Sequence, residues 1–175
     1  MTGLLHRFIK RRDGVAAAEF AIILPALILI LFGTAEIGNA LLIDRKVTRA
    51  TQVIADLVAQ EEVVSDSQLN DIMQAADEIM RPFPTSAEII LTSVWRKSGE
   101  SSTKVDWSVT KRGSAHTTGT PYTLPSIVLD EEEGVIVAEL TFPYQALFPN
   151  VIFSDFTIRD RAYLRPRKTS RVTKS

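Results

Sequence analysis

The sequence predicts an α+β protein in which a long N-terminal helix crosses a membrane and continues into a head made of a short second helix and a small antiparallel sheet. The first observation is the concentration of apolar residues at positions 15–43, where the only charges are Glu19 and Glu36. The second is a three-to-four-residue spacing of apolar positions in two later stretches, which is typical of amphipathic helices. The third is the alternation of apolar and polar residues beyond position 88, which indicates strands.

Residues 15–43 are long and apolar enough to form a transmembrane helix. A helix rises about 1.5 Å per residue, so roughly 20 residues cross the hydrocarbon of a bilayer. Residues 20–35 carry no charge and present no polar face, which argues against the buried helix of a soluble protein. Pro25 lies inside the segment and has no amide hydrogen, so we expect a kink there. The sequence thus predicts one transmembrane helix, kinked at Pro25.

The orientation follows from the kind of signal that precedes the helix. Residues 1–14 hold four basic side chains, counting Lys and Arg, against the single acid Asp13, which predicts a cytoplasmic leader. A cleaved secretory signal peptide is the alternative. It would have an apolar run of about 7 to 15 residues and a small-residue cleavage site, whereas the run here is longer and Ala35-Glu36 is a poor site.

Composition excludes several classes of function. The 175 residues are 45% apolar and 23% charged, as expected of one ordinary domain, and a net charge of -1 leaves no basic field for nucleic acid. The absence of Cys excludes disulfides, thiolate zinc sites, iron–sulfur ligation and a cysteine nucleophile. With His6 and His116 the only histidines, a His-rich metal site is impossible. We expect no cofactor, no metal and no nucleic-acid partner.

Two helical stretches follow the membrane segment. Residues 44–60 continue the first helix as an amphipathic extension, because apolar residues recur there every three to four positions. Ser65 and Gln68 have the spacing of a capping box and predict a second helix over residues 66–81, which Pro82 ends. Its Met73 and Met80 are expected in the core.

The remainder of the head, within residues 61–175, has the pattern of strands. Residues 89–95 and 105–109 predict a hairpin, residues 111–125 a polar loop, and residues 135–142 and 157–164 two further strands. These four strands would form the sheet that covers the helix.

No residue of the head is expected to be catalytic. The acidic run at residues 130–133, followed by Gly134, lacks the ligand spacing of a calcium loop and is interpreted as a solvated turn. His116 lies in a polar loop, and the sequence has no serine nucleophile-elbow motif with which a catalytic histidine would act.

Two features near the end of the chain have open interpretations. From Arg159 onward seven basic residues face one acid, which predicts either docking on an acidic partner or anionic lipid, or a disordered, solvated end. Aromatic residues cluster just before the tail, and burial against the sheet is favoured over an exposed assembly surface. They are Phe142, Tyr144, Phe148, Phe153 and Phe156.

The boundary between the leader and the helix carries a motif. Residues 14–20 are GVAAAEF, with Gly14 at the change from basic to apolar sequence and Glu19-Phe20 five and six residues later. This resembles the processing site of type IV prepilins and pseudopilins. In that family a membrane-embedded aspartic peptidase cuts after the Gly on the cytoplasmic side. The resemblance implies a cut between Gly14 and Val15.

The chemistry of these residues explains why each would be needed at a cleavage site. Gly14 lacks a Cβ, so a protease at the membrane surface can approach the backbone closely. Cleavage would leave a charged amine on Val15, and Glu19 lies four residues on, one helical turn and about 6 Å along the same face. A carboxylate in a bilayer costs on the order of 2 to 4 kcal/mol and usually has a partner. We expect Glu19 to pair with the Val15 amine of its own chain or of a packed neighbour; the alternative is a carboxylate that snorkels to water.

The longer segment around this motif is similar to the TadE-like family of the tight-adherence (Tad, or Flp) pilus machinery. The matching features are Gly14, Glu19, Phe20, Pro25, Gly33, Glu36 and Gly38. The resemblance implies a short, minor-pilin type of pseudopilin with a pilin-like head, anchored by a single pass in a bacterial inner membrane. Its N-terminus would be cytoplasmic and its C-terminal domain periplasmic.

The same resemblance implies partners and a role. The partners would be prepilin peptidase, other pilins and pseudopilins, the inner-membrane pilus assembly platform and the lipid bilayer. The protein would be a peptidase substrate and not an enzyme, and it would be incorporated into the pilus or prime it, hence surface adhesion. A signal-anchored periplasmic binding module that never enters a filament is the alternative; it would have an uncut N-terminus and a concave polar pocket within residues 65–175.

Overall fold

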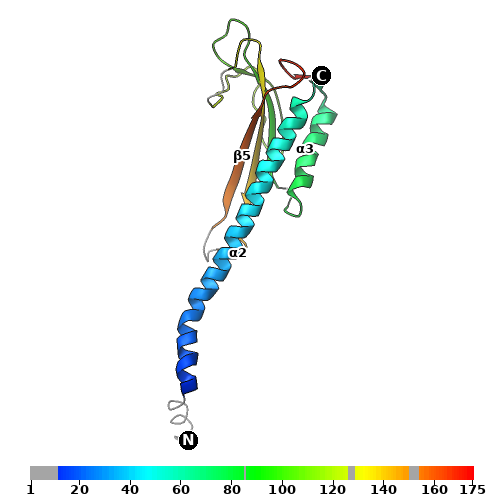
Figure 1. Ribbon diagram of the computed structural model, residues 1–175. Helices are drawn as coiled ribbons and strands as arrows, with labels where there is room; N and C mark the ends of the chain where they lie inside the picture. The colour runs from blue at the N-terminus through cyan, green and yellow to red at the C-terminus, as the bar shows by residue number, and fades with distance from the viewer. Residues whose placement is uncertain (1–11, 85, 126–128, 150–153) are drawn as a thin grey trace. The chain divides into compact units, whose positions relative to one another are not determined.

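The computed structural model describes residues 12–84, 86–125, 129–149 and 154–175, so most of the expected leader lies outside the described residues (Figure 1). The chain forms two compact units. The first contains the described residues up to Ala40 together with those of the segment Gln145–Asp155. The second contains the described residues of Leu41–Tyr144 and Phe156–Ser175. The structure confirms the α+β class, with a long apolar helix, a short helix and a four-stranded antiparallel sheet.

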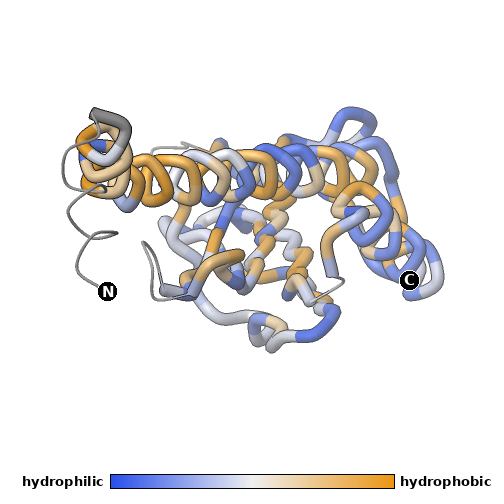
Figure 2. Tube along the Cα trace, turned by 90° about the horizontal axis from the view of Figure 1, so that it is seen from below, coloured by the Kyte–Doolittle hydropathy of each residue, from blue (hydrophilic) through white to orange (hydrophobic). Residues whose placement is uncertain are grey.

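Helix α2 (Arg12–Ala59) has 48 residues and runs through both units. It contains Pro25, which lacks the amide hydrogen that would bond to the carbonyl of Ala21. In the first unit every residue from 14 to 31 is exposed, although nearly all are apolar, as the orange colour along the helix in Figure 2 illustrates. In the second unit the buried positions recur every three to four residues. They include Ile43, Val47, Ala50, Ile54 and Val58.

Helix α3 (Asp66–Met80) forms where the capping box predicts it. The hydroxyl of Ser65 accepts a hydrogen bond from the Gln68 amide at 3.3 Å, and the Gln68 side chain accepts one from the Ser65 amide at 2.9 Å. Because the box satisfies two amides that the first turn leaves free, it fixes the start of the helix. At the other end Lys46 of α2 donates to the carbonyls of Ile79 and Arg81, at 2.9 and 2.5 Å, and so joins the two helices.

The sheet has the strand order β3-β2-β4-β5, with every neighbouring pair antiparallel. The strands are β2 (Glu88–Trp95), β3 (Lys104–Lys111), β4 (Gly134–Tyr144) and β5 (Phe156–Leu164). The predicted hairpin is β2–β3, and the two further predicted strands are β4 and β5. The β2–β3 ladder shifts register between Ser93 and Val94.

Central strand β4 is buried on both faces, which explains its nearly continuous apolar sequence. One face carries Ile136, Ala138 and Leu140 and belongs to the main core. The other carries Val135 and Val137, which pack with Val94 and Leu129 into a second buried cluster. Tyr122 and Leu124 of the loop after β3 pack against that cluster, so the polar loop covers the second face of the sheet.

The basic tail packs against the head, which neither interpretation of the sequence anticipated. Strand β6 (Thr173–Lys174) pairs in parallel with β1 (Val63–Val64), and Val172 is fully buried. Tail cations pair with acids of the head: Arg167 with Asp56, Lys174 with Asp66, Arg171 with Asp106 and Arg165 with Glu133. Burial raises the pKa of Asp106 and the charge of Arg171 opposes that rise.

The aromatic residues before the tail divide between core and surface. Phe142 and Tyr144 are buried, as expected, whereas Phe156 is exposed and Phe153 lies outside the described residues. Phe148 stacks on Phe32 of α2, with ring centroids 4.4 Å apart.

Candidate functional site: the exposed part of helix α2

The residues of the GVAAAEF segment lie in α2. Gly14, Val15, Glu19 and Phe20 are all helical and exposed, Val15 by 58% and Phe20 by 57%. The described part of α2 begins at Arg12, so the bond between Gly14 and Val15 lies within the helix. This bond therefore belongs to the exposed part of α2.

Glu19 and Val15 lie on one face of the helix, one turn apart. Both side chains are exposed, and they lie within the apolar part of α2. The arrangement therefore presents a carboxylate on a lipid-compatible surface, within reach of an amine at position 15 or of a neighbouring helix.

The largest polar network of the head joins the loop to the sheet. Glu139 of β4 is 7% exposed, and its two carboxylate oxygens lie 2.6 Å from Nε2 of His116 and 2.6 Å from Nε of Arg161. The hydroxyl of Tyr122 donates to the same carboxylate at 3.4 Å. Burial and the charge of Glu139 raise the pKa of Tyr122, and Glu139 raises the pKa of Arg161. Because all these groups are engaged with each other, the network serves to hold the loop on the sheet.

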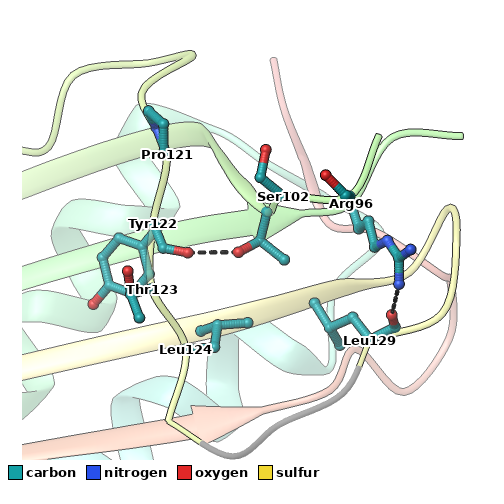
Figure 3. A pocket seen from close by; sticks show the side chains of 9 residues that line it. Arg96, Ser102, Pro121, Tyr122, Thr123, Leu124 and Leu129 are labelled. Carbon is teal, nitrogen blue, oxygen red and sulfur yellow. Dashed lines mark hydrogen bonds between the residues drawn. The ribbon is translucent and has the colours of Figure 1, made fainter. Parts of the chain in front are cut away.

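A hollow of about 380 Å³ lies beside that loop (Figure 3). Hydroxyl and apolar side chains line it, with Arg96 at one end and Tyr122 at the other. The Arg96 guanidinium donates to the carbonyls of Leu129 and Glu100, each at 2.9 Å. Two of its donors are therefore used to shape the hollow.

The acidic run before β4 is a hydrogen-bonded turn, as expected. The side chain of Glu133 accepts a bond from the Asp130 amide at 3.3 Å and pairs with Arg165 at 3.2 Å. Among the described residues no group of three His, Cys, Asp or Glu side chains could hold a metal ion.

Sequence reasoning did not find the role of Glu36. Its side chain is 1% exposed, and its two oxygens accept hydrogen bonds from the backbone amides of Leu147 and Phe148, each at 3.1 Å. The only signal in the sequence is an acid inside an apolar run, and its partners are backbone groups 111 and 112 positions away.

Comparison with known proteins identifies the segment that contains the motif. Residues 14–56 match the family model described as TadE-like protein, which is the family that the sequence resembles. No curated protein and no solved structure matches the chain. The TadE-like segment suggests a protein related to the Tad pilus. Within the described residues one helix, Gly14–Ala59, is long and apolar enough to cross a membrane, which fits a single-pass anchor.

Proposed function

We propose that this protein is a pseudopilin of a Tad pilus, cut by prepilin peptidase between Gly14 and Val15 and held in the bacterial inner membrane by α2. The observation that carries the proposal is the coincidence of three boundaries at positions 14 and 15. The family match begins at Gly14, the basic leader ends there, and the apolar run of the sequence begins at Val15. The leader would be cytoplasmic and the head periplasmic.

The exposure of the motif supports cleavage at this bond. Gly14 and Val15 are both exposed on α2, so a peptidase can reach the backbone between them. Gly14 removes the steric obstacle of a Cβ at the cut. After the cut, the new amine of Val15 lies one turn from the Glu19 carboxylate, so the two charges can neutralise each other at the edge of the bilayer.

Assembly would use the start of α2, which becomes the N-terminus of the protein after the cut. Ala16, Ala17 and Ala18 give this stretch of α2 most of a turn of small side chains, and small residues let membrane helices approach closely. Glu19 would then set the register by pairing with the Val15 amine of an adjacent pilin or pseudopilin. The remaining partners would be the assembly platform and the bilayer. The protein would act as a subunit and not as an enzyme, and its contribution to surface adhesion would follow from the pilus.

The first test is the intact mass and N-terminal sequence of the protein from host membranes with and without prepilin peptidase. We expect an N-terminus at Val15 that reverts to Met1 without the peptidase. Gly14→Val should block the cut because it adds a branched side chain at the scissile bond. Gly38→Ala is the matched control, since a Cβ at Gly38 meets nothing within 4 Å. An uncut wild-type chain in both hosts would refute processing.

The second test concerns Glu19. Glu19→Ala should leave membrane insertion intact and reduce co-assembly with other pilins, because the carboxylate that fixes register is gone. Asp44→Ala is the control, as Asp44 is another exposed acid on α2. Unchanged pilus formation and unchanged co-purification of pilins in Glu19→Ala would refute the pairing.

The second candidate function is a membrane-anchored binding module. The hollow beside Arg96 and Tyr122 favours it, because it is concave, has an arginine and several hydroxyl groups in its lining, and lies within residues 65–175. The same N-terminal measurement separates the two: a binding module keeps its leader, and a pseudopilin loses it.

A further inference from the structure

The loop between β4 and β5 contacts α2 at Phe32 and Glu36, and the position of this contact limits how far along α2 the bilayer can extend. Leu147 and Phe148 place their amides on the Glu36 carboxylate, and Phe148 stacks on Phe32 with an interplanar angle of 15°. Gln145, Leu147 and the flanking Pro149 are exposed. All of these contacts lie within the first compact unit, so their geometry does not depend on how the two units are placed. We call residues 145–149 the clasp.

An irregular segment such as the clasp cannot face hydrocarbon. Lipid offers no partner for free backbone amides and carbonyls, so exposed loops do not occur within the hydrocarbon core. If the bilayer extended to position 43, the end of the apolar run in the sequence, the clasp would lie inside it. The contacts at Phe32 and Glu36 therefore set an upper limit on the lipid-embedded part of α2.

The basic leader sets the other limit of the lipid-embedded part of α2. The length of helix between the two limits equals the thickness of the hydrocarbon core. Residues 14–31 are exposed without interruption, and Gly33 is the first buried residue after them. The 20 residues from Gly14 to Gly33 span about 30 Å of helix, which is the thickness of the hydrocarbon core. The basic leader at one end and the clasp at the other therefore place the hydrocarbon core over the same part of α2.

The buried carboxylate explains why the clasp stays on the helix. Glu36 receives one backbone amide on each oxygen, a charge-assisted arrangement that is stronger than a neutral hydrogen bond. The stacked pair of Phe32 and Phe148 adds an apolar contact between the clasp and the helix. Leu147 is 52% exposed beside them and is free to enter the headgroup region.

We propose that the clasp is a membrane-contact surface that rests on the phospholipid headgroups of the outer side of this membrane and ends the lipid-embedded part of α2 near Gly33. Leu147 and Pro149 would contact lipid, and Glu36 is a positioning residue that holds them there. The inference rests on α2 being a membrane anchor, but not on cleavage after Gly14 or on a pilus.

Single-cysteine labelling tests the position of the membrane, because the chain has no native Cys. The full chain in proteoliposomes, without other pilins, is treated with a membrane-impermeant maleimide from the head side. Ile23→Cys should be protected, and Ile37→Cys, whose native side chain is 49% exposed, should react. Lys97→Cys in the head is the positive control. Protection at position 37 would overturn the proposal, whereas reaction at position 23 would instead refute the membrane anchor.

Lipid quenching tests the contact itself. A fluorophore on Leu147→Cys should be quenched by lipids that carry a quencher near the headgroup and not by lipids that carry it at the chain ends. Glu36→Ala should abolish that quenching, and Asp44→Ala should not. Unchanged tryptophan fluorescence will show that the head of the Glu36→Ala variant is folded, since Trp95 and Trp107 lie in the second unit. Absence of quenching in the parent, quenching by the deep probe, or full quenching in Glu36→Ala would each overturn the proposal.

Discussion

Asp77 of α3 joins the helix to the edge of the sheet through two cations. Its Oδ1 accepts a hydrogen bond from Arg112 at 2.5 Å, and its Oδ2 lies 2.8 Å from Nζ of Lys111. The Asp77 side chain is 11% exposed and each cation is 31% exposed. Burial alone would raise the pKa of Asp77, but the hydrogen bonds and charges of Arg112 and Lys111 outweigh it and hold the pKa below its ordinary value of 3.8.

Replacement of this carboxylate should cost a measurable part of the stability of the head. Asp77→Asn keeps the shape of the side chain and removes its charge. A hydrogen bond to a charged group contributes about 1.5 to 3 kcal/mol when shielded, and an exposed ion pair about 0.2 to 1 kcal/mol. Because water reaches both cations and compensates part of the loss, we expect the free energy of unfolding to fall by about 2 kcal/mol at neutral pH.

The effect should depend on pH with a definite sign. The carboxylate binds a proton less readily in the folded state than in the unfolded state, so its stabilisation is fully present above the unfolded pKa of 3.8. It is lost as the pH falls through the lower folded pKa. The difference between the parent and Asp77→Asn should therefore be constant near neutral pH and vanish in acid.

Urea unfolding of the full chain in detergent micelles measures this difference. Trp95 and Trp107 are the only tryptophans and both lie in the sheet, so their fluorescence reports unfolding of the head and not of the anchor. Asp71→Asn is the matched control, an exposed acid on the same helix. Equal midpoints for Asp77→Asn and the parent at neutral pH, or a difference that persists in strong acid, would refute the reasoning.

Three further substitutions probe the core, the tail and the loop, and urea unfolding measures the first two. Ile54→Ala removes a fully buried side chain of α2 and should cost about 2 to 5 kcal/mol, against a small effect at exposed Leu57. Trp107→Phe deletes the 2.9 Å hydrogen bond from the indole to the carbonyl of Val172 and should cost about 1 kcal/mol, so an unchanged midpoint would contradict a docked tail. Glu139→Gln removes the charge that holds the loop, and limited proteolysis should then cut residues 112–125 sooner; an unchanged cleavage rate would contradict that role.

Local signals in the sequence were sufficient to predict most of the helices and strands of the fold. The start of α3 was predictable because Ser65 and Gln68 satisfy each other's amides within one turn. The β2–β3 hairpin was predictable because alternation on a half-buried strand is a two-residue pattern. The residues proposed for processing also lie in one short segment, so they could be named without a structure.

The contacts that could not be predicted join distant segments through backbone groups. Glu36 bonds to backbone amides, which every residue except Pro has, so no side-chain pattern marks these partners. The β1–β6 pair is only two residues long, too short for an alternation pattern. The charge excess of the tail was visible, but the acids that neutralise it come from α2, α3, β3 and the turn before β4.

The pairing of β1 with β6 also sets an order of events during folding. It joins residues about 110 positions apart, with only two residues on each strand. The few contacts within this pair offset little of the entropy lost on closing so long a segment. Because non-local pairing is slow, we expect this pair to form after the sheet between the two strands. We therefore expect the β1–β6 pair to open more readily than the sheet. Amide hydrogens of Thr173 and Ser175, which bond to the carbonyls of Glu62 and Val64, should exchange with solvent well before those of β4.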